Sequence, residues 1–430
     1  MSIFLLLIPI LIILFFFINP RTTVLCYCAS RYTIDLLWPY QLWENINVLR
    51  IIGVVFPFLL FVYFLQNRQK VYQSPLWKAA LLLLITQLLS SIWAIVINQF
   101  DIVFLPHSHI TIKHIIEWNF RVLNLLSCMI IVPFILNKRS DPMMVIWAFL
   151  ISTIAPILIS LIQITSIPFS ALFENVGHDY SVSLFPRIKS LYHDSGTLAM
   201  MASTAILSST YIILRVKSFF LKIILSLYII LSLAVLYLSF SRTFWISTAL
   251  ALLLYFNFTR KLHMLLTTLL IIIFLFTCIP LTKKRFEREI QFINNSSYTI
   301  DTNGAEKLGT GRIWIWNDAR KHYLNLDWAS KIIGSGGSYS SHNQYIAWLL
   351  RNGILGVIAW AFFFFLILKT MIKNLIVLNF HRYMLFSVIL LFVTLLLSNM
   401  VMQPWDNISF SSFFGIVVGM GIHQNFQRPS

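Results

Sequence analysis

The chain of 430 residues is 58% hydrophobic and only 11% charged, with a formal charge of +17 at pH 7. Soluble proteins carry roughly a quarter charged residues, so this composition excludes an ordinary soluble domain and indicates a polytopic membrane protein. Because the basic residues stand between apolar runs, an anionic lipid or lipid-linked substrate fits the charge better than nucleic acid. We therefore expect a single integral membrane domain, residues 1–430, of the all-α class, with the lipid bilayer as a partner and no nucleic acid.

Apolar runs of about 20 residues predict twelve transmembrane helices. The first run, 3–18, has no basic segment before it, so we interpret it as a retained helix and not as a cleaved signal. A polar, aromatic link at 19–47 follows it. The remaining predicted spans are 48–65, 77–97, 114–136, 143–164, 196–214, 219–240, 244–258, 262–282, 345–368, 383–402 and 408–424.

The short loops between these spans set the expected orientation. If the N-terminus is cytoplasmic, every short inner loop is basic, and the loop with Lys138 and Arg139 is one example. This agrees with the positive-inside rule, whereas the reverse orientation leaves the inner side nearly without short basic loops. We therefore expect both chain ends in the cytoplasm and the long segments 167–195 and 282–342 outside.

Arg242 lies between two predicted spans, in the short outer turn of the segment FSRTFW. That turn is too short to be a solvated loop, and an ionisable residue at membrane depth is a functional hypothesis by default. The cations at 283–288 are interpreted as a solvated helix end or one that faces lipid head groups, because long loops cross the membrane regardless of charge. Arg242 is therefore a candidate site residue.

The longest polar stretch, residues 309–356, brings cations, aromatic residues, a glycine cluster and a histidine together before the chain becomes apolar again. Arg312 begins a predicted helix on which Trp316, Arg320 and Tyr323 share one face. For Arg320, substrate contact and simple exposure to solvent or lipid head groups are both open. The run GSGGSYSS predicts a sharp turn before the tenth span.

His342 directly follows this glycine and serine run. Ser340 and Ser341 are natural N-caps, which would put His342 in the first turn of the next helix. A helix N-terminus and nearby arginines both favour neutral imidazole, the form that can take a proton from a sugar hydroxyl. The alternative is a membrane-surface histidine that caps the helix. Asn343 is expected to orient the site or to cap the helix.

Other histidines carry weaker signals. His193 precedes Asp194, and this pair could orient a substrate or supply an alternative base, while Asp194 could equally cap the sixth span. His107, His109 and His114 have no carboxylate or cysteine at ligand spacing, and no Asp-x-Asp motif occurs in the chain. We therefore expect no metal and no cofactor.

Four segments are similar to known signatures. PRIKSLYHDSGTLAMMAS, LSFSRTFW, GTGRIWIWNDARKHY and SHNQYIAWLLRNGILGVIAW, in this order between about 180 and 370, resemble the motifs of the O-antigen ligase and O-antigen polymerase superfamily. The resemblance implies a metal-independent, inverting glycosyltransferase of the bacterial inner membrane that moves a glycan from undecaprenyl pyrophosphate to an acceptor hydroxyl. It also implies a large periplasmic loop, 283–343, that lies before the tenth helix and carries part of a periplasm-facing active site.

The resemblance assigns roles to individual residues. The leaving group of such a transfer is a pyrophosphate, and arginine suits it because the planar guanidinium meets phosphate oxygens two at a time. Arg187, Arg242 and Arg312 match arginines of the family, and SHNQYI matches its histidine motif. The predicted site comprises catalytic His342 and Arg312, and substrate-binding Arg187, Arg242, Arg320, His193 and Asn343.

Several functions within and beyond this superfamily fit the sequence. A polymerase would use a lipid-linked repeat unit as acceptor, with a chain-length regulator as a further partner; a ligase would use lipid A-core; protein O-oligosaccharyltransferases share the signatures. The compact segment between Arg312 and His342 favours a polymerase. A lipid-linked glycan transporter would instead show repeats or interrupted helices with charges at mid-membrane.

Overall fold

The computed structural model describes most of the chain. The described residues are 2–36, 41–43, 46–96, 103–105, 108–109, 112–138, 140–164, 195–239, 241–261, 312–336, 342–377, 382–394 and 407–423, with positions 263, 264, 266, 267, 270 and 399. Almost all of them are helical, so the predicted all-α class is confirmed. Two short antiparallel hairpins are the exception: β1 (Gln41–Trp43) with β2 (Ile46–Asn47), and β3 (Val103–Leu105) with β4 (Ser108–His109).

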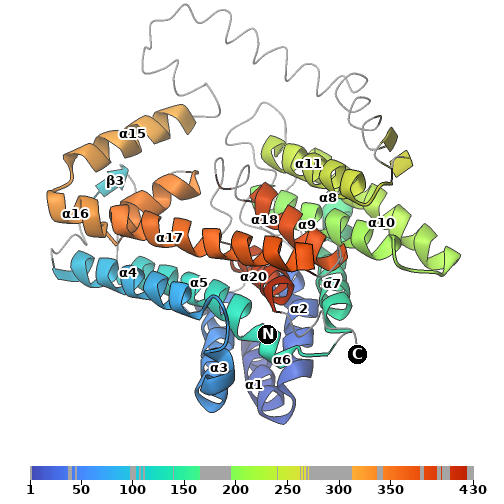
Figure 1. The fold of residues 1–430 in the computed structure, drawn as a ribbon, viewed down its shortest axis with the longest axis horizontal. Coiled ribbons are helices and arrows are strands. Elements are labelled where there is room, and N and C mark those ends of the chain that lie inside the picture. Colours follow the sequence, from blue (N-terminus) through green and yellow to red (C-terminus); the bar gives the residue numbers. More distant parts are fainter. Residues whose placement is uncertain are drawn as a thin grey trace, which may run out of the picture.

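Figure 1 shows the helices coloured in chain order, from α1 in blue to α20 in red. The first eight are α1 (Ser2–Ile18), α2 (Pro20–Asp35), α3 (Val48–Val71), α4 (Trp77–Val96), α5 (Ile112–Ile130), α6 (Val132–Ile135), α7 (Asp141–Ser152) and α8 (Ile154–Ile164). The later ones are α9 (Ser195–Ile213), α10 (Phe219–Leu238), α11 (Arg242–Phe258), α15 (Arg312–Asn325), α16 (Trp328–Ile333), α17 (Gln344–Val377), α18 (Arg382–Val393) and α20 (Ile408–Ile422).

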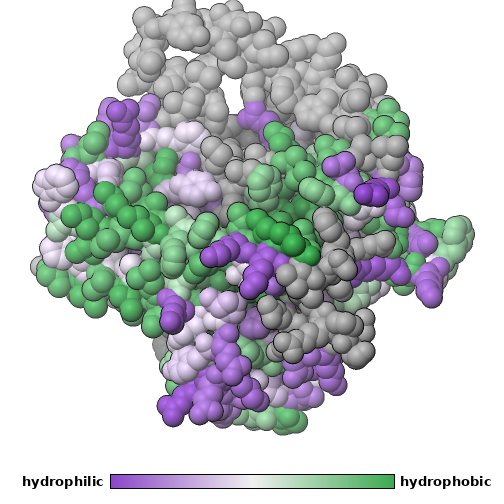
Figure 2. All heavy atoms as spheres, in the orientation of Figure 1, coloured by the Kyte–Doolittle hydropathy of each residue, from purple (hydrophilic) through white to green (hydrophobic). Residues whose placement is uncertain are grey.

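Membrane insertion is supported by length and apolarity. Within the described residues, seven stretches are long and apolar enough to cross a membrane: Arg50–Val71, Trp77–Val96, Ile115–Ile135, Asp141–Ile162, Ser195–Ile213, Phe219–Leu238 and Gln344–Ile376. The outward faces of α4 and α10 are lined by exposed leucine, isoleucine and phenylalanine, as lipid contact requires. Figure 2 shows this apolar cover over α4. The total of twelve spans stays a prediction, and most of the expected span 262–282 lies outside the described residues.

The predicted polar link at 19–47 is wrong for most of its length, because residues 20–35 form the helix α2. The Asn19 side chain accepts a hydrogen bond from the Thr22 backbone N–H at 3.1 Å, and Pro20 supplies a favourable first position. The polar residues of α2, among them Arg31 and Asp35, are buried against other helices. Hydrophobicity therefore missed α2, since its polar side chains find partners inside the protein.

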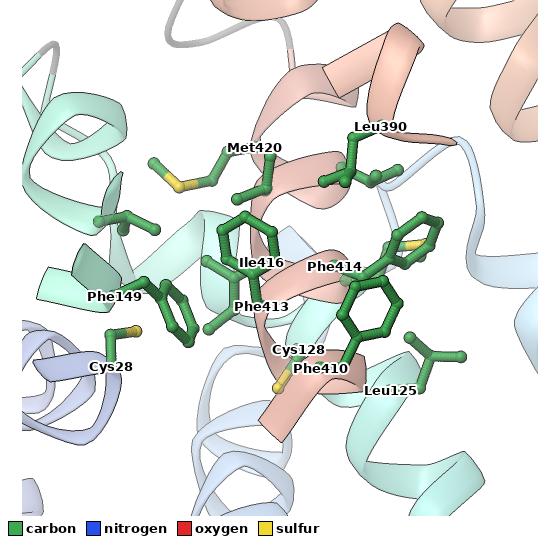
Figure 3. Close-up of a cluster of buried hydrophobic side chains, with 14 of the residues drawn as sticks. Cys28, Leu125, Cys128, Phe149, Leu390, Phe410, Phe413, Phe414, Ile416 and Met420 are labelled. Atoms are coloured by element: carbon green, nitrogen blue, oxygen red, sulfur yellow. The ribbon is translucent and has the colours of Figure 1, made fainter. Parts of the chain in front are cut away.

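Helix α20 forms the centre of the core (Figures 1 and 3). All its residues from Ser409 to Ile422 are buried, and it packs against α2, α5, α7, α17 and α18. Figure 3 shows Phe413 and Phe414 packing against side chains of the surrounding helices. A Cβ on Gly415 would lie 2.9 Å from the carbonyl oxygen of Leu125, so glycine lets α20 approach the α5 backbone closely.

Helix α17 is not one straight helix, as the predicted span 345–368 requires, but two arms joined at Gly353. This residue has φ 63° and ψ −167°, which is outside the helical region. The rings of Trp348 and Trp360 stack with centroids 4.4 Å apart, although twelve residues of continuous helix would separate them by about 18 Å. The arm Gln344–Asn352 therefore folds back on the long arm that follows, as in a re-entrant helical hairpin.

Contacts between helix ends identify one end of the bundle, here called the basic end. The Tyr63 hydroxyl in the C-terminal half of α3 donates to the Phe134 carbonyl in α6 at 3.5 Å, and the Asn374 amide near the end of α17 donates to the Ile422 carbonyl at 3.0 Å. Arg21 at the start of α2 pairs with Asp141 at the start of α7 at 2.5 Å. The short basic loops that follow α3 and α6 lie at this end.

Candidate functional site

The described residues of the polar stretch 309–356 form α15, α16 and the start of α17 at one side of the molecule, where α16 contacts α4 and α17 and α15 contacts α17 (Figure 1). The helix predicted to begin at Arg312 is confirmed as α15. Asp327 caps α16, because its carboxylate accepts from the Ser330 N–H at 2.8 Å and from the Ser330 hydroxyl at 2.6 Å. These hydrogen bonds hold the pKa of Asp327 below its usual range. The Trp93 indole donates to Ser330 at 3.0 Å and fixes α16 to α4.

The turn after α16 is hydrogen-bonded to the bend of α17. The backbone N–H groups of Ser335 and Gly336 donate to the carbonyls of Leu350 and Arg351 at 2.8 and 2.9 Å. These carbonyls stand at the end of the short arm, where the arm itself offers them no N–H donor. Gly334 has φ 96°, and a Cβ on it would collide with the Arg351 carbonyl, so only glycine fits. The described start of the glycine run, residues 334–336, thus fixes the re-entrant arm, and the rest of the predicted turn lies outside the described residues.

The predicted caps Ser340 and Ser341 are wrong. The side-chain oxygen of Asn343 accepts from the Tyr345 N–H at 2.9 Å and from the Ile346 N–H at 3.1 Å, so α17 begins at Gln344. His342 therefore precedes the helix and does not lie in its first turn. It is exposed and has φ 49°, a left-handed conformation that few residues other than glycine adopt. The backbone thus presents this imidazole at the surface beside the first N–H groups of the short arm.

Buried polar groups follow His342 in the first turns of α17. The side chain of Gln344 is fully buried, and within the described residues neither its amide oxygen nor its amide nitrogen has a hydrogen-bond partner. The indole N–H of Trp348, four residues later and on the same helix face, has none there either. An unsatisfied buried polar group costs about 1–3 kcal/mol, so natural proteins rarely keep one without a reason. This face of the short arm is suited to a polar ligand or to water, and sequence analysis missed it.

A second polar cluster, also missed, surrounds the α17 bend. The Arg351 guanidinium is buried and lies 3.9 Å above the Trp118 ring of α5. The Asn352 amide and the Trp118 indole both donate to the Gln87 side-chain oxygen, at 2.6 and 2.9 Å, and Ser90 donates to the Arg351 carbonyl. Arg351 lies inside the predicted span 345–368. An ionisable residue within a membrane span is a sequence signal for function, and it could have identified this cluster.

A third cluster joins α2 to α20. Arg31 and Asp35 form a buried ion pair at 3.2 Å, and the Ser409 hydroxyl donates to Asp35. The hydroxyls of Tyr27 and Ser412 are hydrogen-bonded at 3.0 Å. Because both charges of the pair are removed from lipid and water, the cluster ties the two helices together at a fixed register.

Arg242 is the first residue of α11 and is half-buried. The turn before it is tight, as predicted: the Trp245 indole donates back to the Leu236 carbonyl at 2.8 Å and stacks on Tyr237. Further along α11, a small apolar crevice of about 10 Å³ lies between α9, α11 and α18. It is lined by Leu207, Thr210, Ala251, Leu252, Tyr255, Phe386, Ile389 and Leu390.

The structure describes only some of the remaining predicted site residues. Arg320 is exposed on α15, and Arg312 is the first residue of that helix, although its side chain is not among those described. Arg187 and His193 lie outside the described residues. Helix α17, which begins beside His342, contacts both α15 and α18, and α18 contacts α11. The helices that carry Arg242, Arg312, Arg320 and the residues after His342 are therefore linked through direct helix contacts, α15 to α17 to α18 to α11.

No protein-family model matches the chain, and no curated protein matches it. Among the described residues, no three His, Cys, Asp or Glu side chains gather in a way that could hold a metal ion.

Proposed function

We propose that this protein is a membrane glycosyltransferase that moves a glycan from a polyprenyl pyrophosphate to an acceptor sugar hydroxyl. Within this class, the function that we propose is that of an O-antigen polymerase of a bacterial inner membrane. The proposal rests mainly on His342. This residue is exposed, has a left-handed backbone conformation and directly precedes the short arm of α17, whose start is capped by Asn343. Buried amide atoms of Gln344 that have no partner among the described residues lie next to it.

The chemistry assigned to this arrangement is a direct displacement. His342, as neutral imidazole, takes the proton of the acceptor hydroxyl while that oxygen bonds to the anomeric carbon. The bond from this carbon to the pyrophosphate oxygen breaks with inversion, and negative charge grows on the leaving group. The guanidinium groups of Arg312 and Arg242 would stabilise that charge, with Arg187 and Arg320 as further contacts.

The surroundings of Arg242 support a lipid-linked donor. Its helix begins at the end where a pyrophosphate would lie, and the apolar crevice of α9, α11 and α18 opens further along the same helix. A polyprenyl chain attached to the pyrophosphate would lie against the apolar outer surface at this crevice, which favours binding. His193 and Asn343 complete the proposed set, with Asn343 acting by fixing the start of α17.

The site faces the periplasm in this proposal. The basic loops that follow α3 and α6 stand at the basic end, which the positive-inside rule assigns to the cytoplasm, and α17 runs from His342 toward that end. Two short helices, α15 and α16, fill the segment between Arg312 and the glycine turn. That compactness supports a polymerase over a ligase, whose lipid A-core acceptor would need a dedicated surface.

Replacing His342 tests the proposal. We expect His342→Ala to lower glycan transfer by about 10²–10⁴-fold, because a general base contributes that much. Transfer would be measured with purified protein and a lipid-linked repeat unit, with His322→Ala on α15 as the matched control that keeps activity. Near-normal transfer by a folded His342→Ala protein would remove the histidine from the mechanism. In cells, one repeat unit on the core without a ladder would identify a polymerase, and a bare core a ligase.

A lipid-glycan transporter is the second candidate, because one specific observation favours it. The bend of α17 interrupts a membrane helix and carries the buried Arg351, a combination typical of transporters. A transporter would move labelled lipid-linked glycan across vesicle membranes, and His342→Ala would leave that movement intact. The exposed position of His342 at the helix start fits surface chemistry better.

A further inference from the structure

Helix α16 and the end of α15 expose large apolar side chains. Trp328 is 78% exposed, and Ile332, which lies one turn later on the same face of α16, is 39% exposed. Leu324, near the end of α15, is 56% exposed. We call these three residues the α16 patch. Apolar residues that gather on a surface in this way indicate contact with a membrane or with a protein partner.

Contacts with α4 place α16 beside the end of that helix that lies away from the basic end (Figure 1). The Trp93 indole of α4 donates to the Ser330 hydroxyl of α16 at 3.0 Å. Trp93 lies about 5 Å before the end of the candidate span Trp77–Val96, measured along the helix axis. Helix α16 is therefore at the level where this span leaves the membrane.

The bend of α17 gives the same level for the end of α16. A Cβ on Gly353 would lie 2.3 Å from the Ile332 carbonyl oxygen, so α16 ends directly against the bend. Ser90 of α4 donates to the Arg351 carbonyl in this bend. Because Ser90 lies about 9 Å before the end of its span, the bend is inside the membrane but close to its boundary.

The α16 patch continues two surfaces that face lipid. Ile92 and Val96, in the last turns of α4, are exposed apolar residues of one candidate span. Ile354 and Leu355, directly after the bend of α17, are exposed apolar residues of another. Since α16 contacts both helices at these levels, its apolar face extends the area that acyl chains cover. Tryptophan is enriched at this boundary, where its ring meets apolar chains and its N–H meets water.

Lysines accompany the α16 patch. Lys331 lies three residues after Trp328, and its helix face is therefore adjacent to the exposed indole. Lys321, which is exposed, stands in the same relation to Leu324. A lysine beside an apolar surface can extend its ammonium group to the phosphates of lipid head groups. Apolar residues with lysines next to them are typical of segments that lie in the plane of a membrane surface.

We propose that α16 is a membrane-surface anchor. The α16 patch inserts between the head groups and acyl chains of the phospholipid leaflet that lies away from the basic end. The turn after α16 is hydrogen-bonded to the end of the short arm of α17, so the anchor also sets the height of that arm relative to the lipid phosphates. The anchor goes beyond the proposed function and serves a transferase or a transporter equally.

The first test measures the depth of Trp328 in the membrane. A bimane fluorophore is attached to Trp328→Cys in the cysteine-free full-length protein, in nanodiscs of phosphatidylcholine and phosphatidylglycerol. We expect lipids with brominated acyl chains to quench it about twofold, as they should quench the lipid-facing reference Ile92→Cys. Gln73→Cys, in the turn between α3 and α4, should respond to iodide in the water phase instead. Quenching of the Trp328→Cys label by iodide alone would overturn the anchor, and quenching by neither agent would assign the patch to a protein contact.

The second test keeps Trp328 and places the fluorophore on Leu324→Cys. Brominated lipids should quench this label, and adding Trp328→Ser should reduce that quenching to about half, because the indole holds the segment at the membrane. Ile230→Ser, on the exposed face of α10, is the matched control and should leave the quenching unchanged. Equal quenching with both serine variants would show that Trp328 does not anchor α16. Glycan transfer is not measured in either test, so failure of the proposed function leaves both results intact.

Discussion

His423 and His342 have opposite environments at the residue scale. His423 ends α20 at the basic end, is buried, and packs against the Phe134 ring with centroids 4.4 Å apart. Burial lowers the pKa of its imidazole from the ordinary value to about 4. His342 is exposed and precedes a helix. One residue type thus serves as packing at one end and as the candidate base at the other.

His423 should make stability depend on pH. Between its pKa of about 4 in the folded state and its ordinary pKa near 6.5, the unfolded state binds more protons. The free energy of unfolding should therefore fall as pH drops from 7 to 5. Thermal unfolding of the purified protein at both pH values measures this, and His423→Phe should reduce the difference. An equal drop in both proteins would assign the pH dependence to other groups.

Among the helices, the short arm of α17 determines where His342 lies relative to the rest of the bundle. Its end carbonyls are hydrogen-bonded by the glycine turn, its start is capped by Asn343, and its Trp348 stacks on the long arm. These contacts come from three different segments of the chain. The position of His342 relative to the bundle therefore depends on the bend at Gly353.

Gly353→Ala should disrupt this bend. Gly353 has φ 63°, and an added Cβ would collide with the Ile332 carbonyl, so we expect a loss of more than about 1 kcal/mol of stability together with loss of transfer. Thermal unfolding and transfer assays measure both effects. Gly53→Ala is the control, since its Cβ would meet only the Ile408 side chain, at 3.1 Å. Wild-type behaviour of Gly353→Ala would show that the bend does not control the site.

The whole molecule has a different N-terminal topology from the one that hydrophobicity predicts. Because α2 is an additional helix and Arg21 pairs with Asp141 at the basic end, α1 and α2 form a hairpin whose turn lies at that end. If this end is cytoplasmic, the start of α1 is periplasmic, in place of the expected cytoplasmic N-terminus.

Cysteine labelling tests this topology. In a cysteine-free protein, Ser2→Cys should react with an impermeant maleimide in intact spheroplasts, because the start of α1 would face the medium. Gln73→Cys, in the turn between α3 and α4, should react only after permeabilisation. Labelling of Ser2→Cys only after permeabilisation would restore the cytoplasmic N-terminus.

The sequence by itself determined the membrane class, most helices and the location of the polar stretch 309–356. Apolar runs and the charged segments between them are local signals that can be found without the structure. It also indicated α15 and the glycine turn, since capping and glycine chemistry act within a few residues. Only the tertiary structure decided the buried helix α2 and the fold-back of α17. These depend on partners far away in sequence: Asp35 on Ser409, Asn352 on Gln87, and Gly334 on the Arg351 carbonyl. Polar residues become core residues when distant helices supply their hydrogen bonds, and no local pattern records that.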